Sequence, residues 1–392
     1  MYSSEDHSTQ HAYPLPQGRP TILIDHIQGE PSSFKLSPPH SASSFAQSPS
    51  HTYPDWVSEL VKPLLPCIDE SIGDPRNFYH ELVEIAECES GSSIYAARVV
   101  DPEGITARSL STLLVAIKIV PLNPGGTPKL RDIEQELALL KSQSLPSLAS
   151  LSHPIYHQNI VIPDTVYIDL EEGSLWLRME LMERSVADVI QLIEEGLMLQ
   201  ERMIARVAAD VLQGLKFLET QGIAHRDVRS DNLLVSRDGV VKIADFSFAL
   251  RVTPGGPLCT DPAGVVYWQA PEIRQGPYDP MKVDVWSLGA TVWEMAESQP
   301  PFSANDAANG EDNRVAVTEQ WPPLSQPNIY SPGFHEFLRI CSQPASSRPT
   351  PGALLKSPFV TNACGRLVIV QLLSQCVSIE QMVQERENEA AA

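Results

Sequence analysis

The side chains of this sequence that could do chemistry are concentrated between residues 225 and 247. His225-Arg226-Asp227 is followed, five residues after the aspartate, by Asn232 and, eighteen residues after it, by Asp245-Phe246-Ser247. A carboxylate can accept a proton from a hydroxyl, and carboxylate and amide oxygens are ligands that Mg²⁺ prefers. A His-Arg-Asp triplet alone also occurs by chance, as a solvated loop with one ion pair. Its companions in the chain therefore decide between these interpretations.

Further motifs accompany the triplet in a defined order. Val115-Ala116-Ile117-Lys118 closes an apolar run that begins at Leu113, and Glu136 follows eighteen residues after the lysine. Ala270-Pro271-Glu272 and then Asp284-Val285-Trp286-Ser287-Leu288-Gly289 lie downstream. The whole series resembles the protein kinases in type, spacing and order. The resemblance predicts an α+β, two-lobed kinase fold, with a small β-rich N-lobe that carries one helix and a larger, mostly helical C-lobe.

The resemblance to kinases implies a role for each charged residue. Asp227 would accept the proton of the substrate hydroxyl, and Asn232 and Asp245 would hold the Mg²⁺ ions that bridge the phosphates of ATP. Lys118 would bind the α- and β-phosphates, held in place by an ion pair with Glu136. The alternative for Lys118 and Glu136 is a pair of solvated charges.

Hydrophobic periodicity indicates the elements that must position these residues. The apolar run at 113–118 is typical of a buried strand. Residues 130–142 have the spacing of a helix, with Glu136 near the edge of its apolar stripe. Residues 367–383 have a similar pattern, typical of a helix that packs on the C-lobe or on a partner.

Several stretches most closely resemble the PAK group of the sterile-twenty serine/threonine kinases. They are SIGDP at 71–75, HRDVRSDN at 225–232 and YWQAPE at 267–272, and the resemblance covers about residues 72–360. It implies that Arg348 pairs with Glu272 to brace the C-lobe. That role is structural.

The same resemblance implies which residues bind the nucleotide. Met179 would be the gatekeeper, the segment 180–182 would be the hinge that hydrogen-bonds adenine, and Leu234 would lie under the ring. The nucleotide-binding residues implied in this way are Ile85, Gly91, Ala116, Lys118, Met179, Glu180, Met182 and Leu234.

The segment that should cradle the phosphates departs from the kinase pattern. Where three glycines are expected after Ile85, residues 86–95 read AECESGSSIY and keep only Gly91. Backbone amides approach phosphate oxygens where no Cβ intervenes, so Ala86 and Cys88 should loosen the cradle. The acidic residues of this segment add repulsion. We therefore expect weaker ATP binding.

Three substitutions lie around the metal turn and the catalytic loop. Ser247 replaces the glycine that ends the metal turn, but metal binding should survive. Arg229 replaces the lysine that neutralises the transferred phosphoryl group, and it keeps the charge without the compact ammonium geometry. Val265 replaces a threonine expected to contact both that lysine and Asp227. Losing both members of one contact predicts either a rebuilt substrate site or a relaxed need for phosphoryl transfer.

One position in the activation segment has competing interpretations. Asp261 aligns with the threonine that PAK kinases phosphorylate. Its carboxylate could pair with Arg226 and supply part of a phosphate's charge, which would order the segment without an upstream kinase. Alternatively, Thr260 is itself the switch, or neither residue matters.

Length and composition suggest one kinase domain with additional segments. We expect a disordered Ser/Pro-rich tail at 1–55, a lead-in at 56–77, a kinase domain at 78–360 and a helical tail at 361–392. The N-lobe would span 78–181 and the C-lobe 182–360.

Composition also excludes several classes of partner. A formal net charge of −21 argues against nucleic-acid and anionic membrane surfaces. We expect no membrane span and a cytoplasmic location. The six cysteines show no paired metal spacing. Pro31-Ser32-Ser33-Phe34 resembles a fragment of the GTPase-binding motif of PAK proteins, but the histidines that should follow are misplaced, so we do not expect small-GTPase binding.

Two functions follow from the sequence. The first is an ATP- and Mg²⁺-dependent protein serine/threonine kinase with a protein substrate. The second is a pseudokinase scaffold that regulates a partner kinase with weak or no phosphotransfer. The complete charged set favours the kinase, whereas the eroded glycine segment favours the scaffold. The sequence does not identify the substrate, the upstream activator, the phosphorylation state of Thr260 or the oligomeric state.

Overall fold

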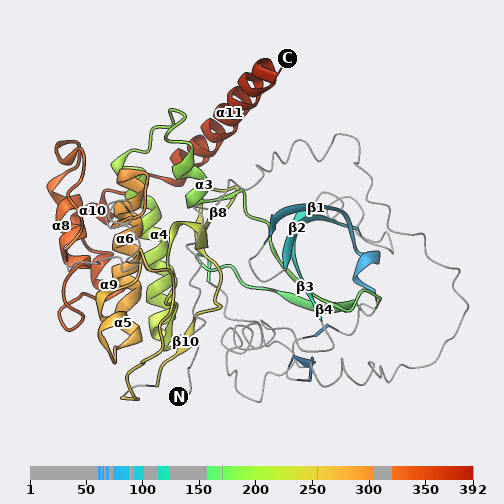
Figure 1. Cartoon of the computed structure of the whole chain (residues 1–392), viewed down its shortest axis with the longest axis horizontal. Helices are drawn as coiled ribbons and strands as arrows, with labels where there is room; N and C mark the ends of the chain where they lie inside the picture. Colours follow the sequence, from blue (N-terminus) through green and yellow to red (C-terminus); the bar gives the residue numbers. More distant parts are fainter. Residues whose placement is uncertain are drawn as a thin grey trace, which may run out of the picture.

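The structure is a computed structural model, and it describes residues 61–62, 64–65, 68–69, 74–87, 92–100, 114–122, 157–169, 171–253, 255–303 and 320–391. The predicted tail at 1–55 and the predicted helix at 130–142 lie outside the described residues, and so do Glu136 and Gly91. The described residues form a β-rich N-terminal part and a helical C-terminal part (Figure 1), so the predicted two-lobed α+β fold is confirmed.

The N-lobe contains a five-stranded antiparallel sheet in the order β1-β2-β3-β5-β4. A short 3₁₀ helix, η3, precedes it. The elements are η3 (Pro75–Asn77), β1 (Tyr79–Glu87), β2 (Ser93–Val99), β3 (Leu114–Pro121), β4 (Thr165–Asp169) and β5 (Ser174–Glu180). In β3, Val115 and Ile117 are buried in one apolar cluster. Because side chains alternate along a strand, Ala116 and Lys118 share the opposite face.

The C-lobe is built from helices with two short sheets beside them. Its helices are α3 (Val186–Gln191), α4 (Glu201–Thr220), α5 (Pro271–Gln275), α6 (Val283–Glu297), α8 (Pro332–Cys341), α9 (Pro351–Leu354), α10 (Pro358–Thr361) and α11 (Arg366–Ala391). The 3₁₀ helices are η5 (Ser230–Asn232), η6 (Pro280–Lys282) and η7 (Pro327–Ile329). The short strands are β6 (Arg184–Ser185), β7 (Ile223–Ala224), β8 (Leu233–Val235), β9 (Val241–Ile243) and β10 (Leu250–Arg251).

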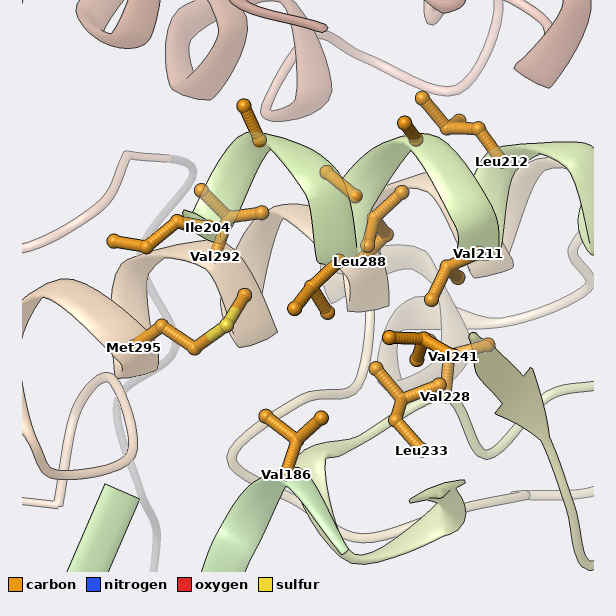
Figure 2. Close-up of a cluster of buried hydrophobic side chains, with 14 of the residues drawn as sticks. Val186, Ile204, Val211, Leu212, Val228, Leu233, Val241, Leu288, Val292 and Met295 are labelled. Carbon is orange, nitrogen blue, oxygen red and sulfur yellow. The ribbon is translucent and has the colours of Figure 1, made fainter. Parts of the chain in front are cut away.

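The core of the C-lobe lies between α4 and α6 and extends to the catalytic loop (Figure 2). Ile204 and Val211 of α4 pack in one cluster with Leu288 of α6. Val228, which follows Asp227 in the catalytic loop, and Leu233, which follows Asn232, are fully buried in the same cluster. Burying side chains of this size stabilises a fold by about 1.5–3 kcal/mol each. The core therefore anchors the residues that directly follow Asp227 and Asn232.

The predicted helix near the C-terminus is α11, and it packs on the C-lobe. Ile369, Leu372 and Cys376 are buried in the main C-lobe cluster. Among the described residues, α11 is also the one helix that is long and apolar enough to cross a membrane, by length and composition alone. The expected absence of a membrane span is therefore not confirmed.

Candidate active site

A buried carboxylate of helix α6 holds the beginning of the catalytic loop. Asp284 accepts hydrogen bonds from the backbone N–H groups of His225, at 2.8 Å, and Arg226, at 2.7 Å. Arg226 has a positive φ of 66°, which non-glycine residues adopt only where the surroundings hold them. Burial raises the pKa of Asp284, and the neighbouring His225 and Arg226 oppose this effect. These contacts fix the direction in which Asp227 leaves the loop.

Asp227 is buried and held from several sides. The side-chain amide of Asn232 donates to its carbonyl oxygen at 2.9 Å and to Oδ2 at 2.8 Å. The backbone N–H of Val265 donates to Oδ1 at 3.2 Å. Burial raises the pKa of Asp227, the Arg229 guanidinium opposes that rise, and the negative charge of Asp245 adds to it. A carboxylate held in one geometry with a raised pKa suits proton acceptance.

Asn232 and Asp245 present the ligand types that were expected for a metal. Both hydrogen bonds from the Asn232 amide nitrogen go to Asp227, so the amide oxygen is the atom of this group suited to a hard cation. Asp245 has a φ of 63°, and the backbone N–H of Ser247 donates to its Oδ1 at 3.2 Å. The donor set thus fits Mg²⁺.

Lys118 lies electrostatically close to the metal turn. Enclosure by the protein raises the pKa of Asp245, but the positive charge of Lys118 and the hydrogen bonds from Ser247 outweigh it, so the pKa is lowered. Asp245 is therefore ionised at neutral pH. Asp245 therefore lies close enough to Lys118 of β3 and to Asp227 for their charges to interact.

A cavity of about 160 Å³ contains most of the residues expected to bind nucleotide. Ala116 and Met179 face each other in the pairing of β3 with β5, and both line the cavity. Leu234 also lines the cavity. Its neighbours in β8 are buried in the core, and alternation along the strand places Leu234 on the opposite face. The predicted residues that line this cavity are Ile85, Ala116, Met179, Glu180, Met182 and Leu234.

The acidic side chains of this cavity have partners among the described residues. Glu180 pairs with Lys242, and Glu183 pairs with Arg237 at 2.8 Å. Asp188 accepts the backbone N–H of Ser185 at 2.7 Å, in the capping box that begins α3. Glu380 pairs with Arg184 at 2.7 Å. A polyanionic ligand would therefore not meet a row of uncompensated carboxylates here.

The substitutions at 229 and 265 retain contact with Asp227 through other atoms. The guanidinium Nε of Arg229 is 3.5 Å from Oδ2 of Asp227, a charge contact without hydrogen-bond geometry. Arg229 also pairs with Asp231 and lies over the ring of Trp268, 5.9 Å from its centroid. Val265 contacts Asp227 through its backbone. The structure therefore favours a rebuilt site over a lost one.

The activation segment contains the ion pair that was one of the sequence-based alternatives. Arg226 donates to Oδ2 of Asp261 at 2.8 Å and to the hydroxyl of Tyr278 at 3.2 Å. The Tyr278 hydroxyl in turn donates to the backbone carbonyl of Asp261 at 2.9 Å. The hydrogen bond from Arg226 lowers the pKa of Asp261 despite some burial. The segment is thus connected to the catalytic loop by a charged and a neutral contact.

Glu294 is a site residue that the sequence reasoning missed. This carboxylate of α6 is buried and accepts hydrogen bonds from Ser230 Oγ at 2.6 Å and Trp268 Nε1 at 2.8 Å. It therefore joins the catalytic loop to the segment that precedes α5. Burial raises the pKa of Glu294 to about 8, although both hydrogen bonds oppose this effect. An acid in the middle of a helix whose neighbouring residues are nearly all apolar is the signal that could have identified it.

The predicted brace of the C-lobe is present. Arg348 donates to Glu272 at 2.6 and 3.1 Å, and its guanidinium carbon lies 5.3 Å from the ring centroid of Trp286. Of the predicted catalytic and metal residues, Asp227, Arg229, Asn232, Asp245 and Lys118 are brought together. Glu136 and Gly91 lie outside the described residues, so their predicted roles remain predictions.

Comparison with known proteins agrees with this geometry. The family model described as "Protein kinase domain" matches residues 106–360, and the chain therefore belongs to the protein kinase domain family. The serine/threonine-protein kinase pakB of Dictyostelium discoideum is 35% identical over 253 residues, which are 64% of this chain and 27% of that protein. The serine/threonine-protein kinase shk1/pak1 of Schizosaccharomyces pombe is 33% identical over 300 residues, 75% of this chain and 41% of that protein.

A third relative extends the match along the chain. The serine/threonine-protein kinase STE20 of Candida glabrata is 31% identical over 323 residues, 81% of this chain and 32% of that protein. The chain thus spans between about a quarter and two fifths of the length of these relatives. The predicted resemblance to the PAK and STE20 group is confirmed for the kinase region.

Proposed function

We propose that this protein is a serine/threonine kinase that transfers the γ-phosphoryl group of Mg-ATP to a protein substrate. The observation that supports it most strongly is the arrangement at Asp227. Asn232 holds its carboxylate at 2.8 Å, and the positive charge of Lys118 lowers the pKa of Asp245. The names of the relatives support serine and threonine as acceptors.

Each residue has a role in this reaction. Asp227 orients the acceptor hydroxyl and takes its proton, and Arg229 offsets negative charge beside it. Lys118 binds the nucleotide phosphates, and Asn232 and Asp245 hold Mg²⁺, which neutralises charge on the transferred group when it is bound. The cavity of Ala116, Met179 and Leu234 would hold the adenine ring. Catalysis is then mainly positioning and charge neutralisation.

The experiment is phosphate transfer from labelled ATP to a basic protein with Mg²⁺, comparing the wild type with Asp227→Asn. The variant keeps the size of the side chain and removes the proton acceptor, so transfer should fall by about 10²-fold or more. ATP affinity, measured by thermal stabilisation, should change little, because Asp227 does not line the adenine cavity.

Transfer that is equal in both proteins would contradict the proposed role of Asp227. Absence of transfer and of nucleotide binding in the wild type would favour the scaffold function, and a partner kinase would then be sought by coprecipitation.

A further inference from the structure

The C-terminal helix α11 reaches the nucleotide cavity. It begins beside α4 and continues beyond the C-lobe (Figure 1). Glu380, in the second half of α11, lines the same cavity as Ile85, Ala116 and Leu234. The helix follows the region that the kinase family model matches, which ends at residue 360. One wall of the cavity is therefore supplied from outside that region.

Glu380 is connected to the exit of the hinge by a buried ion pair. Arg184 donates to its two carboxylate oxygens at 2.7 and 3.3 Å. Only 7% of the Arg184 side chain and 12% of the Glu380 side chain are exposed. The Arg184 Nε atom is buried and has no hydrogen-bond partner among the described residues. Removing one member of such a pair leaves an uncompensated buried charge.

Arg184 occupies a position from which its displacement would change the cavity. It follows Met182 and Glu183 directly, and it opens β6. In β6, Arg184 pairs with Val235 and Ser185 pairs with Leu234 of β8. A shift of Arg184 would therefore move the end of the hinge, at Met182 and Glu183, and also strand β8, which lines the cavity through Leu234.

A second ion pair of α11 provides a contrast. Arg386, which lies about 1.7 turns beyond Glu380 in α11, pairs with Glu195. Both of these side chains are exposed, at 65% and 39%, and neither lines the cavity. Exposed pairs of this kind contribute little to stability. Both pairs attach α11 to the C-lobe, but only the pair of Arg184 and Glu380 lines the cavity. Comparing them therefore distinguishes the effect of attachment from the effect of contact with the nucleotide site.

We propose that α11 is a component of the nucleotide-binding site, and that Glu380 is a positioning residue that acts through Arg184 on the hinge. The inference rests on the proposed kinase function. Glu380 neutralises Arg184 and holds it in place, so the segment 182–185 and β8 keep the spacing that accepts an adenine nucleotide. A change in the position of α11 on the C-lobe should therefore change the affinity of the protein for nucleotide.

The test compares Glu380→Gln with the matched control Glu195→Gln in the full chain. Both variants replace a carboxylate that pairs with an arginine across the contact of α11 with the C-lobe. We expect Glu380→Gln to raise the Kd for ATP and the KM for ATP by about tenfold, with kcat and the KM for the protein substrate nearly unchanged. Glu195→Gln should leave all four quantities at wild-type values.

A charge exchange provides the second variant. Arg184→Glu combined with Glu380→Arg restores opposite charges, and it should recover most of the ATP affinity that either single substitution loses. This double variant also provides a test of the proposal if Glu380→Gln does not fold.

The outcomes are distinguishable. A lower Tm for Glu380→Gln with an unchanged Kd for ATP would show that the pair is only a structural support, and it would overturn the proposal. An exchanged variant that folds but binds ATP as weakly as the single variants would do the same. A wild-type protein that binds no nucleotide would contradict the proposed function itself.

Discussion

The guanidinium of Arg226 and the carboxylate of Asp261 lie 2.8 Å apart and join the catalytic loop to the activation segment. Arg226 is buried, whereas the Asp261 side chain is 62% exposed. The Nε–H of Arg226 also donates a hydrogen bond to the backbone carbonyl oxygen of Phe248 at 2.8 Å. A fixed carboxylate therefore occupies the position at which a charged group, such as a phosphate, can order this segment.

We expect this ion pair to make activity independent of phosphorylation in the segment. Asp261→Asn should lower kcat several-fold, because the amide keeps the shape but loses the charge that binds Arg226. Thr260→Ala, at the adjacent position, should have no effect, and phosphatase treatment should leave wild-type activity intact. The measurement is the initial rate at saturating ATP. Loss of activity in Thr260→Ala or after phosphatase treatment would identify Thr260 as the switch instead.

Gly264 should tolerate no larger residue. Its φ is +77°, and an added Cβ would lie 2.4 Å from the carbonyl oxygen of Arg226 and 3.1 Å from Oδ1 of Asp227. Gly255 has nearly the same φ, +73°, but an added Cβ there would contact nothing within 4 Å. Both alanine variants have the same backbone strain, and only Gly264→Ala adds a clash.

We therefore expect Gly264→Ala to lower kcat by about 10²-fold, because the clash displaces the catalytic loop. Gly255→Ala should retain near wild-type activity. Steady-state kinetics of the two purified variants, with circular dichroism to verify folding, provide the measurement. Equal effects of the two substitutions would mean that backbone strain, and not contact with the loop, limits both.

The pH dependence of the rate should report on Asp227. Burial raises the pKa of Asp227, so the ionised base is lost as pH falls through a value above the usual 3.9 of aspartate. The Arg229 guanidinium opposes this rise, so Arg229→Gln should move the acidic limb of the profile for kcat to higher pH. The measurement is kcat from pH 5 upwards. An acidic limb that stays in place would exclude Arg229 as a determinant of this pKa.

The free energy of unfolding should decrease as the pH rises, because of Glu294. Burial raises its pKa to about 8, above the 4.5 of an exposed glutamate, so the folded protein binds a proton that the unfolded chain releases. The stabilisation is complete below about pH 4.5 and is lost as the pH rises through about 8. Glu294→Gln should flatten this part of the curve of Tm against pH. An unchanged slope of Tm against pH in this variant would show that other groups cause the decrease in stability.

The sequence predicted the chemical centre well, because that centre depends on short spacings. Asn232 and Asp227 are five residues apart in one loop, and the structure places their side chains in contact. The family resemblance placed Ala116 and the gatekeeper Met179 in the nucleotide site, and the pairing of β3 with β5 does bring them to one face. Resemblance to a known family identified the remaining partner, the brace between Glu272 and Arg348.

The supporting contacts could not be predicted, because they join distant parts of the chain. Ser230 and Glu294 are separated by 64 residues, and Arg184 and Glu380 by 196. No local pattern specifies such pairs, since each depends on how whole helices pack. The prediction that the contact between position 265 and Asp227 is lost failed for a different reason. It considered only the side chain, and the identity of a side chain does not show which hydrogen bonds the backbone of the same residue makes.

The hydrogen bond from the Val265 backbone to Asp227 changes how natural variation at this position should be interpreted. An N–H group is present in every residue except proline, so this contact does not depend on which side chain occurs at position 265. Selection on the contact therefore acts on the torsion angles around Gly264 and Val265, and the side chain at 265 can drift over evolutionary time. In related sequences, the absence of threonine here is a poor criterion for a catalytically dead protein.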